Sequence, residues 1–576
     1  MNNANKSIFS LFEDVCQKFP DNIAIRHGNV SITYRELRLA ILSVSTILGK
    51  HEKPIGIRCQ NPINAITSMM ACLLNKIIFI PLSPDWPIGR IQAICKNANS
   101  DSVIVDSCFQ TTTLSTINIE HLSLETTSVG KSIKTLPSND GIAYILFTSG
   151  TTGTPKGVAQ SESALRQHVL HYIASIKAES HDRIIMVASF GYDAALMDVF
   201  ASLLTGATLY PLTILDHSTL NLRQIICSEL ITVFHSTPSV FRLIFGEETE
   251  QNTYENLRVV VLGGEVARRA DLKLFNLLCS TEAILINGYG PSESTLAMQA
   301  HFSHGVQAFH NSLPIGIPVP EVRVDLVNIE TTAEGEVGEI VLLGPNVFMG
   351  YIQSPSDIVK LKQTRRKVEH HTGDLALRLS NGHLLYLGRK DNQIKISGVR
   401  IELEEINSLL VDIVGVDDVV TCVVERDNDS KHLVSYVRLP DGELQEDYVR
   451  ESLGEKLPQA AIPSRIVSVD SFTYLPNGKI DFSALPKLNH IIDQKQDIDI
   501  FSQTILDIWR VDLGLDHPIH LEDRFIDIGG SSLKAISVIS RIQKGIGIRV
   551  RPSALLQNPT LREFVALVKK GAEHAV

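Results

Sequence analysis

Apolar and polar positions follow two different periods along roughly the first 385 residues of the chain. Stretches with apolar residues three or four positions apart predict helices, and short runs that are almost wholly apolar predict buried strands. The expected strands are residues 54–59, 77–82, 102–106, 258–264 and 283–288. Because such strands alternate with helices, the pattern predicts an α/β fold built in layers.

The pattern changes in the last third of the chain. After Gly338, "GEIVLLG" and "GHLLYLGRKDNQIKISG" read as paired strands of a sheet-rich subdomain, and an α+β pattern follows to about residue 485. Residues 486–500 are polar and aperiodic, as expected of a linker, and the rest has the helical periodicity of a small bundle. We therefore expect a large multi-layer α/β part at residues 1–389 and a smaller α+β part at residues 390–485. A linker at residues 486–500 and a helical bundle at residues 501–576 should follow.

The most apolar stretch, residues 65–82, is interrupted by Asn75 and Lys76 and contains Pro81. It predicts a buried helix followed by a strand, not a membrane span. The first 20 residues lack a basic start and an apolar core, so no export signal is expected and a cytoplasmic location is predicted.

Composition narrows the function classes further. The 576 residues include 44% hydrophobic and 20% charged residues, as in globular proteins, and on length alone suffice for about four domains. A net charge of -11 argues against a nucleic-acid or anionic-membrane surface. The eight cysteines form no C-x-x-C pair and are expected to be reduced core residues. The H-x-x-H pairs His168/His171 and His301/His304 lack a third ligand nearby, so we expect surface or core histidines and no zinc.

A Gly- and Thr-rich segment follows an apolar strand in "YILFTSGTTGTPKGV", residues 144–158. Small residues and hydroxyls expose backbone N–H groups that can surround a phosphate. The spacing differs from the Walker pattern, because Lys156 follows Gly153 by three residues and is followed by Gly157. By itself, the segment fits either another kind of phosphate loop or an ordinary turn.

A second glycine turn precedes a predicted helix in "FIDIGGSSLKAISVISRI", residues 525–542. Ser532 stands where that helix should begin, so it is either a helix N-cap or a hydroxyl open to modification. "DIGGSSL" resembles the attachment site of peptidyl and acyl carrier domains. The resemblance implies that Ser532 carries 4'-phosphopantetheine, attached by a phosphopantetheinyl transferase.

Nearly the whole chain resembles the amino-acid adenylation domains of nonribosomal peptide synthetases, within the adenylate-forming enzymes that include acyl-CoA synthetases. Eight motifs occur in the family's order: "ITYRELR", "LFTSGTTGTPKGV", "FGYDAALMDVF", "NGYGPSEST", "GEIVLLGPNVFMGY", "HTGDLAL", "GRKDNQIKISGVRIELEEI" and "LPNGKID". The resemblance implies an adenylation core, its small subdomain and a carrier domain. It also implies that a carboxylate attacks the α-phosphorus of ATP and expels pyrophosphate, with Mg²⁺ bound.

The resemblance assigns roles to individual residues. Glu293 would bind Mg²⁺, Tyr289 would flank adenine, and Asp374, with Arg389 nearby, would bind the ribose hydroxyls. Lys479 would be the main catalytic cation and Asp391 the hinge between two arrangements of the small subdomain. The remaining ATP-binding residues would be Thr148, Ser149, Gly150, Thr151, Thr152 and Lys156 at the phosphates, with Asn287, Gly290 and Ser292. Outside this ordered set, the Thr-Gly-Asp and Asn-Gly-Lys turns would be ordinary solvated loops.

Matching the family's pocket by spacing gives the residues expected around the amino acid. With Lys479 they are Asp193, Ala194, Met197, His235, Val261, Gly263, Gly288, Leu296 and Ala297. Asp193 would pair with the substrate ammonium, and the others would contact its side chain. The walls are small and apolar, which favours a mid-sized, largely apolar or aromatic amino acid. His235 is either a core histidine or a contact for a polar tip, such as a hydroxyl.

Some positions depart from the family pattern. Ser292 replaces a more common threonine, the pair His370–His371 replaces an aromatic and a basic residue, and Phe482 replaces a basic residue. None of these changes removes a proposed catalytic charge.

Two alternatives to amino-acid activation remain at this point. An acyl- or aryl-acid-CoA ligase would not need Asp193, because its substrate has no ammonium group. A non-catalytic carrier scaffold would not need the retained Lys479, Asp374 and Glu293. Neither a condensation H-H-x-x-x-D-G motif nor a thioesterase G-x-S-x-G elbow is found. We therefore expect a free-standing loading module that works with separate condensation or tailoring enzymes.

Overall fold

The computed structural model divides the chain into two compact units. The first comprises Met1–Ser149, Thr154–Thr213 and Gln224–Gly398, and the second is formed mainly by Val399–Val576. The structure describes residues 6–107, 109, 111, 113–119, 141–148, 155–212, 214–246, 248, 253–308, 310–363, 369–390, 393–396, 399–416, 419–425, 431–439, 444–470, 472, 485–486, 499–515, 519–526, 528–557 and 560–573.

One sheet of the first unit has seven strands in the order β18-β8-β7-β4-β3-β5-β6. Their bounds are β3 (Ile55–Arg58), β4 (Phe79–Pro81), β5 (Ser102–Val105), β6 (Ser115–Asn118), β7 (Ile142–Thr148), β8 (Lys156–Ser161) and β18 (Gly350–Ile352). Strands β3, β4, β5, β6 and β7 run parallel, and β8 returns antiparallel to β7 and pairs with β18. The glycine-rich segment therefore connects two neighbouring antiparallel strands.

The second sheet has nine strands in the order β15-β14-β13-β12-β11-β9-β10-β1-β2. Their bounds are β1 (Ile23–His27), β2 (Val30–Thr33), β9 (Arg183–Met186), β10 (Thr208–Pro211), β11 (Val233–Ser236), β12 (Val259–Leu262), β13 (Ile284–Tyr289), β14 (Met298–Ser303) and β15 (Ile317–Pro318). Its central strands are parallel and almost fully buried, as expected of a sheet covered on both faces.

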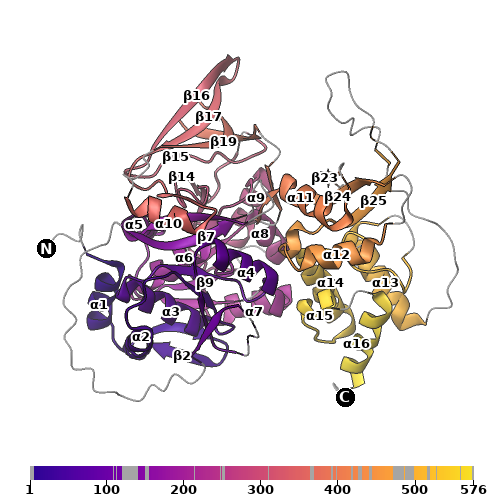
Figure 1. The fold of residues 1–576 in the computed structure, drawn as a ribbon, viewed down its shortest axis with the longest axis horizontal. Helices are drawn as coiled ribbons and strands as arrows, with labels where there is room; N and C mark the ends of the chain where they lie inside the picture. The colour runs from indigo at the N-terminus through magenta and orange to yellow at the C-terminus, as the bar shows by residue number, and fades with distance from the viewer. Residues whose placement is uncertain are drawn as a thin grey trace. The chain divides into compact units, whose positions relative to one another are not determined.

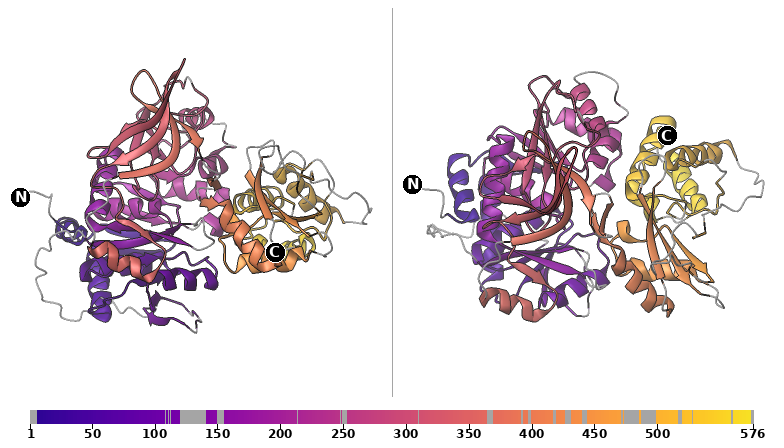
Figure 2. Two further views of the ribbon diagram at one scale, coloured as in Figure 1. Left: turned by 45° about the horizontal axis from the view of Figure 1, so that its top comes forward. Right: turned by 90° about the horizontal axis from the view of Figure 1, so that it is seen from above.

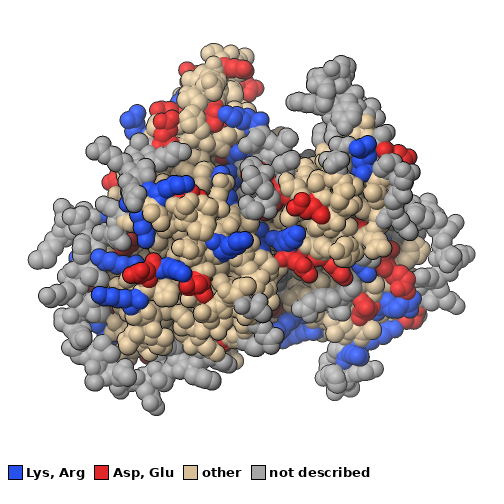
Figure 3. All heavy atoms as spheres, viewed as in Figure 1, with Lys and Arg blue, Asp and Glu red and all other residues tan. Residues whose placement is uncertain are grey.

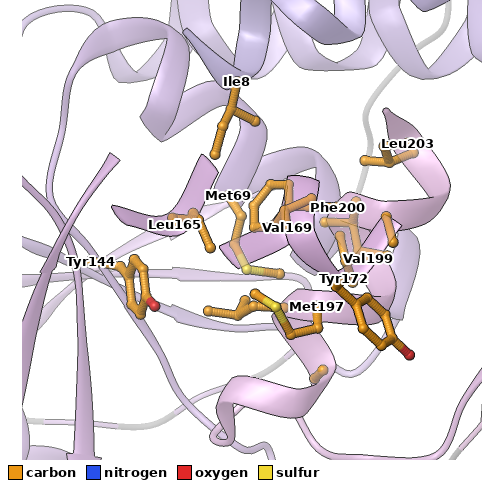
Figure 4. Close-up of a cluster of buried hydrophobic side chains, with 14 of the residues drawn as sticks. Ile8, Met69, Tyr144, Leu165, Val169, Tyr172, Met197, Val199, Phe200 and Leu203 are labelled. Carbon is orange, nitrogen blue, oxygen red and sulfur yellow. The ribbon is translucent and has the colours of Figure 1, made fainter. Parts of the chain in front are cut away.

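Helices lie between these two sheets. Helix α3 contacts β3 and β4 of the first sheet and β1 of the second, while α5 contacts β7 and β8 and packs on α6, which contacts β9, β10 and β11. Their apolar side chains share one buried core, part of which is drawn in Figure 4. The helices of this part are α1 (Ile8–Lys18), α2 (Tyr34–Leu48), α3 (Pro62–Asn75), α4 (Ile88–Asn97), α5 (Glu162–Ile176), α6 (Asp193–Leu203), α8 (Pro238–Phe245), α9 (Arg269–Leu278) and α10 (Pro355–Gln363). Helix α7 (Thr219–Ser228) is divided between the two units after Arg223.

A four-stranded antiparallel sheet ends the first unit, and three of its strands, β16, β17 and β19, are labelled at the top of Figure 1. It consists of β16 (Arg323–Thr332), β17 (Gly335–Leu343), β19 (Glu369–Arg378) and β20 (Leu384–Arg389), and is followed by β21 (Gln393–Ile396). The sheet was predicted to begin after Gly338, but β16 starts 15 residues earlier, at Arg323. Most residues of β16 are exposed, so it lacks the apolar run that marks a buried strand.

The second unit begins with an α+β part and ends with helices, which are the yellow group in Figure 2. The α+β part contains β22 (Val399–Glu402), α11 (Leu403–Val414), β23 (Val419–Glu425), β24 (Lys431–Arg438), α12 (Glu446–Gly454) and β25 (Arg465–Val469). The helical part contains α13 (Ile500–Leu513), α14 (Ser532–Ile546), α15 (Pro552–Gln557) and α16 (Leu561–Glu573). Trp509, Phe525 and Phe564 are central to its core, with ring centroids 4.9 and 5.7 Å from the Trp509 ring.

Several smaller expectations can be compared with the structure. Residues 65–82 form most of α3 and then β4, as predicted, and no helix among the described residues is long and apolar enough to cross a membrane. Five cysteines are buried, but Cys227 is exposed on α7, so its assignment to the core was wrong. His168 is a core histidine whose Nε2 lies 3.1 Å from the Asn346 carbonyl oxygen. Basic and acidic side chains are interspersed on the face drawn in Figure 3.

Candidate active site

The ends of the predicted phosphate loop lie opposite each other on β7 and β8. Thr148 pairs with Lys156 in the antiparallel register, and the Thr148 hydroxyl lies 3.4 Å from the Lys156 carbonyl oxygen. The Lys156 Nζ atom lies 3.3 Å from the centroid of the Tyr351 ring, a cation–π contact with β18. The strand pairing therefore places an ammonium group beside the base of the loop. Ser149, Gly150, Thr151 and Thr152 lie outside the described residues.

Glu293 is a buried carboxylate next to this ammonium-bearing strand pair. The Tyr351 hydroxyl donates a hydrogen bond to Glu293 Oε1 at 2.7 Å, and His370 Nε2 lies 3.9 Å from Glu293 Oε2. The His370 ring packs edge-on against Phe348, with ring centroids 5.3 Å apart. Hard oxygen donors such as this carboxylate suit Mg²⁺, which proteins often bind through one or two carboxylates and substrate phosphates.

The turn that carries Glu293 depends on Gly290. A Cβ atom on Gly290 would lie 2.1 Å from the Thr295 carbonyl oxygen, so a larger residue would push the turn open. On the strand before it, the Asn287 side chain donates to the carbonyl oxygens of Leu313 and Pro314. The Ser292 carbonyl oxygen accepts a hydrogen bond from Gln160 of β8 at 3.1 Å. These bonds fix the turn between the two large sheets.

Asp374 is hydrogen-bonded to two other predicted nucleotide-binding residues. The Tyr289 hydroxyl donates to its Oδ2 atom at 2.5 Å, and Arg389 donates to its Oδ1 atom at 2.9 Å. Burial and the nearby Asp374 charge raise the pKa of Tyr289 well above its ordinary value, so its hydroxyl keeps its proton. The Thr372 hydroxyl accepts from the Asp374 backbone N–H, which orders the Thr-Gly-Asp turn. This carboxylate is thus oriented by bonds from two other strands or loops.

The predicted amino-acid pocket has one wall on α6. Asp193 is the first residue of that helix, and its Oδ1 atom accepts from the Ala194 backbone N–H at 2.9 Å. Met197 lies one turn further along and is buried. A carboxylate is favoured at a helix N-terminus by the helix dipole. Asp193 is therefore a carboxyl-bearing residue at the start of a helix that is mostly apolar apart from Asp198.

The other pocket residues lie where the parallel strands β11, β12 and β13 end. His235 pairs with Val261 in the register of β11 and β12. A Cβ atom on Gly263 would lie 3.4 Å from the Gly288 carbonyl oxygen and 4.0 Å from His235 Nε2. One on Gly288 would lie 3.9 Å from Leu296 Cδ1, and Ala297, next along, is buried. Ligand sites in open α/β sheets typically lie outside such carboxyl ends.

Three residues at these sites were not predicted from the sequence. Tyr351 contacts both Glu293 and Lys156, and its position at the end of the motif "GEIVLLGPNVFMGY" was a usable signal. Tyr172 and Asp198 contact the predicted pocket residue His235 from helices α5 and α6. Their sequence spacing gives no such signal, because helix packing brings them together.

Residues 12–352 match the family model described as "AMP-binding: AMP-binding enzyme". The chain belongs to the AMP-binding enzyme family. Residues 503–568 also match the family described as "Phosphopantetheine attachment site". The two matches confirm the family resemblance seen in the motifs and the order of its two parts.

The chain is similar to curated members of this family along nearly its full length. It is 29% identical to tyrocidine synthase 2 from Brevibacillus parabrevis over 591 residues, 99% of this chain but 16% of that protein. It is 27% identical to gramicidin S synthase 1 from Brevibacillus brevis over 590 residues, 98% of this chain and 52% of that protein. The chain thus spans only a sixth to a half of these relatives.

Solved structures show the same fold. Holo-PA1221, an NRPS protein with adenylation and PCP domains bound to a vinylsulfonamide inhibitor, aligns with a TM-score of 0.80, 23% identity and coverage of 98% of this chain and 97% of that chain. The Vibrio cholerae adenylation domain AlmE, in complex with glycyl-adenosine-5'-phosphate, aligns with a TM-score of 0.68 and 22% identity. The alignment covers 82% of this AMP-binding enzyme and 95% of that chain. The predicted fold class, a multi-layer α/β core with an α+β part and a small helical bundle, is confirmed.

In the phosphopantetheine-site region of this AMP-binding enzyme, Ser532 is the first residue of α14 and is only partly buried. The helix is capped by Ser531 instead, whose side chain accepts from the Lys534 backbone N–H at 3.2 Å. Gly529 has φ of +99°, and a Cβ atom on Gly530 would lie 2.3 Å from Phe525. The glycine pair thus presents Ser532 at a helix N-terminus, where a phosphate group is favoured by the helix dipole and free N–H groups.

Besides the four loop residues, two further residues proposed from the motifs of this AMP-binding enzyme are not placed. Asp391 and Lys479 lie outside the described residues. Among the described residues, Lys390 just before Asp391 donates to the buried carboxylate of Glu339 at 2.6 Å, and Glu339 also accepts from the Gly373 N–H at 3.1 Å. Glu339 therefore links the chain before the predicted hinge to the turn that carries Asp374.

Proposed function

We propose that this chain activates an amino acid with ATP as an aminoacyl-adenylate and transfers the aminoacyl group to its own carrier region. The observation that carries the proposal is the presence, in one chain, of an AMP-binding region with an acidic residue at its predicted substrate pocket and a phosphopantetheine-site region with an accessible serine. Both halves of the reaction then have their residues in the same chain.

The first half-reaction needs groups that hold ATP while negative charge develops on its phosphates. Asp374, oriented by Tyr289 and Arg389, would accept hydrogen bonds from the ribose hydroxyls. Lys156, at the base of the loop, would pair with the departing pyrophosphate. Glu293 would hold Mg²⁺, which neutralises phosphate charge when bound. Lys479 would stabilise the charge between the attacking carboxylate and the α-phosphate.

The nucleophile would be held by the residues at the start of α6. Asp193 would pair with the substrate α-ammonium, which leaves the carboxylate free to reach the α-phosphorus. This residue favours an amino acid over a fatty or aryl acid, because neither of those acids has a cation to offset the charge of Asp193. The proposed loop residues Ser149, Gly150, Thr151 and Thr152 and the neighbours Asn287, Gly290 and Ser292 would complete the nucleotide site.

The second half-reaction would use Ser532. A phosphopantetheinyl transferase would attach 4'-phosphopantetheine to its hydroxyl, and the attached arm supplies a thiol that accepts the aminoacyl group. The small subdomain would swing about Asp391 between the two half-reactions. We further propose the boundaries 1–389 and 390–485 for the adenylation domain, 486–500 for the linker and 501–576 for the carrier domain, with condensation or tailoring enzymes as downstream partners.

The test measures the two half-reactions separately. Amino acids are screened by ATP–pyrophosphate exchange, and loading is followed by intact mass after treatment with a phosphopantetheinyl transferase. We expect Ser532→Ala to keep exchange and to lose both the phosphopantetheine mass and loading. Ser531→Ala is the matched control: it removes the helix cap, worth about 1 kcal/mol, but keeps the attachment hydroxyl and both mass increments. Exchange with fatty or aryl acids and none with amino acids would support a CoA ligase and overturn the proposal.

A further inference from the structure

A buried carboxylate lies directly behind the one polar residue of the predicted side-chain pocket. Asp198 Oδ1 lies 2.9 Å from His235 Nδ1 and accepts a hydrogen bond from the Tyr172 hydroxyl at 3.0 Å. These residues come from α6, β11 and α5, and the Tyr172 and His235 rings lie with centroids 5.6 Å apart. Figure 4 shows Tyr172 in the buried cluster together with Met197, the pocket residue that precedes Asp198. The three side chains form a connected polar group inside an apolar core.

Because these side chains are buried, an unneutralised charge on any of them would be costly. The side chain of Asp198 is 0% exposed and that of His235 is 11% exposed. The second oxygen of Asp198, Oδ2, has no hydrogen-bond partner among the described residues. A buried carboxylate with an open oxygen is costly unless a cation neutralises it. His235 is the group in contact that can supply this charge, by holding a proton on each ring nitrogen.

The acidic neighbours of His235 also favour its protonated form. Burial lowers the pKa of His235, but the Asp198 carboxylate, with a smaller effect of Asp193, raises it above its ordinary value. Tyr172 is neutral in this arrangement, because burial and the Asp198 charge raise its pKa well above the ordinary value. Burial also raises the pKa of Asp198, while the charge and hydrogen bond of His235 act against that rise, so the pair shares a proton and is neutral as a whole.

The hydrogen bond also fixes which ring nitrogen faces the pocket. Because Nδ1 is turned to Asp198, Nε2 lies on the other side of the ring. It points toward the strand ends, since a Cβ atom on Gly263 would be 4.0 Å from Nε2 and 3.4 Å from the Gly288 carbonyl oxygen. Those two glycines are predicted pocket residues. Protonated His235 thus directs an N–H donor toward the space that the substrate side chain is proposed to occupy.

We propose that Asp198, supported by Tyr172, is a positioning residue that holds His235 as a hydrogen-bond donor, and that this site selects an uncharged amino acid whose side chain carries an acceptor such as a hydroxyl or amide oxygen. The inference rests on the proposed function. An acidic side chain is disfavoured, because the His235 charge is already neutralised by Asp198 and Asp193 adds a second negative charge nearby. A basic side chain is disfavoured by the N–H donor itself.

The experiment compares amino acids of matched shape in ATP–pyrophosphate exchange with the full chain. The pairs are valine and threonine, leucine and asparagine, and phenylalanine and tyrosine. The readout is the ratio of kcat/KM within a pair, which a general loss of folded protein leaves unchanged. In the best-accepted pair we expect the polar member to be favoured by about 10- to 100-fold, the range for a hydrogen bond to a charged group. A preference for the apolar member in all pairs would overturn the inference.

Variants then assign the roles. His235→Phe should abolish or reverse the preference, His235→Gln should restore part of it by keeping a donor, and Asp198→Asn should reduce it by about tenfold. Tyr172→Phe should have a smaller effect. The matched control is Asp271→Asn, which removes another wholly buried carboxylate, bound to Arg242 at 2.8 Å, away from the predicted pocket. An unchanged ratio in Asp198→Asn, at wild-type level, would overturn the role of Asp198.

A pH profile separates positioning from packing. His235 loses its donor at Nε2 as pH rises through its raised pKa, so the preference for acceptors should fall at alkaline pH. In Asp198→Asn that fall should move to lower pH, because the carboxylate no longer raises the pKa. A profile that does not move would contradict the inference. Absence of exchange with every amino acid would instead show that the proposed function is wrong, so the two failures are distinguishable.

Discussion

The hydroxyl of Tyr289 and the carboxylate of Asp374 share a 2.5 Å hydrogen bond, although 85 residues separate them along the chain. Tyr289 ends a strand of the nine-stranded sheet, and Asp374 belongs to the four-stranded sheet. The bond therefore joins two sheets at the proposed nucleotide site, and it orients the carboxylate before ATP binds.

This bond predicts the effect of Tyr289→Phe. The substitution keeps the ring that is proposed to flank adenine but removes a donor to a charged acceptor, a bond typically worth about 1.5–3 kcal/mol. We expect the KM for ATP in pyrophosphate exchange to rise about tenfold, and Asp374→Asn to raise it further. The KM for the amino acid is the internal control and should stay within about twofold. An unchanged KM for ATP in both variants would show that Asp374 does not contact the nucleotide.

The hydrogen bond from Tyr351 to Glu293 predicts an altered magnesium requirement. Tyr351→Phe keeps the ring beneath Lys156 but removes the hydroxyl that orients the carboxylate. Loss of such an outer contact commonly weakens metal binding by about 10-fold or more. We expect the Mg²⁺ concentration for half-maximal exchange to rise by that factor, with activity recovered at saturating Mg²⁺. The activity of Glu293→Gln should not be recovered at saturating Mg²⁺. Equal Mg²⁺ dependence in Tyr351→Phe and the unaltered protein would rule out this link.

The glycine turn before Ser532 predicts opposite outcomes for two Gly→Ala substitutions in one region. In Gly530→Ala the new Cβ would lie 2.3 Å from both the Phe525 side chain and its carbonyl oxygen, so we expect a loss of about 1–3 kcal/mol and slower phosphopantetheine attachment. Gly545, inside α14, has no neighbour within 4 Å of such a Cβ, so Gly545→Ala should stabilise by about 1 kcal/mol. Chemical denaturation followed by Trp509 fluorescence measures both. Equal effects would mean that the turn tolerates a side chain.

The ion pair between Asp182 and Arg258 predicts how the stability of the protein depends on pH at acidic values. Burial raises the pKa of Asp182, but bonds from Arg258, the Glu179 N–H and Thr232 outweigh burial and hold it below its ordinary value. A carboxyl group whose pKa is lower in the folded protein contributes stability at pH values above its unfolded pKa of about 3.9. This contribution is lost as the pH falls through the folded pKa. This contribution is therefore complete near neutral pH and disappears below about pH 4.

Asp182→Asn should remove that acid dependence. At pH 7 we expect a loss of about 2–3 kcal/mol, below the usual cost of breaking a buried pair because Arg258 is partly exposed. The difference from the unaltered protein should shrink as pH falls from 5 to 3. The control is Asp101→Asn in the exposed pair with Lys53, which should change stability by less than about 0.5 kcal/mol. A pH-independent difference for Asp182→Asn would contradict the assignment. Urea titrations at each pH measure it.

Local sequence determined much of the fold and proposed the candidate site residues. The runs 54–59, 102–106 and 258–264 became β3, β5 and β12, because a short apolar run encodes burial without reference to the rest of the chain. The resemblance of the motifs to known families named Glu293, Asp374 and Ser532 as candidates. Helix α14 begins at Ser532, as its apolar periodicity predicted.

The tertiary structure decided the features that no local pattern encodes. The exposed strand β16 has too few buried positions to be read from hydrophobicity, and its place is fixed by pairing with β17. The meeting of Asp198 with His235 and Tyr172 depends on the register of β11 and on how α5 packs against α6. Such contacts join residues far apart in sequence, and their geometry follows from the whole packed core. Sequence thus proposed which residues take part in the chemistry, while packing determined which side chains contact each other.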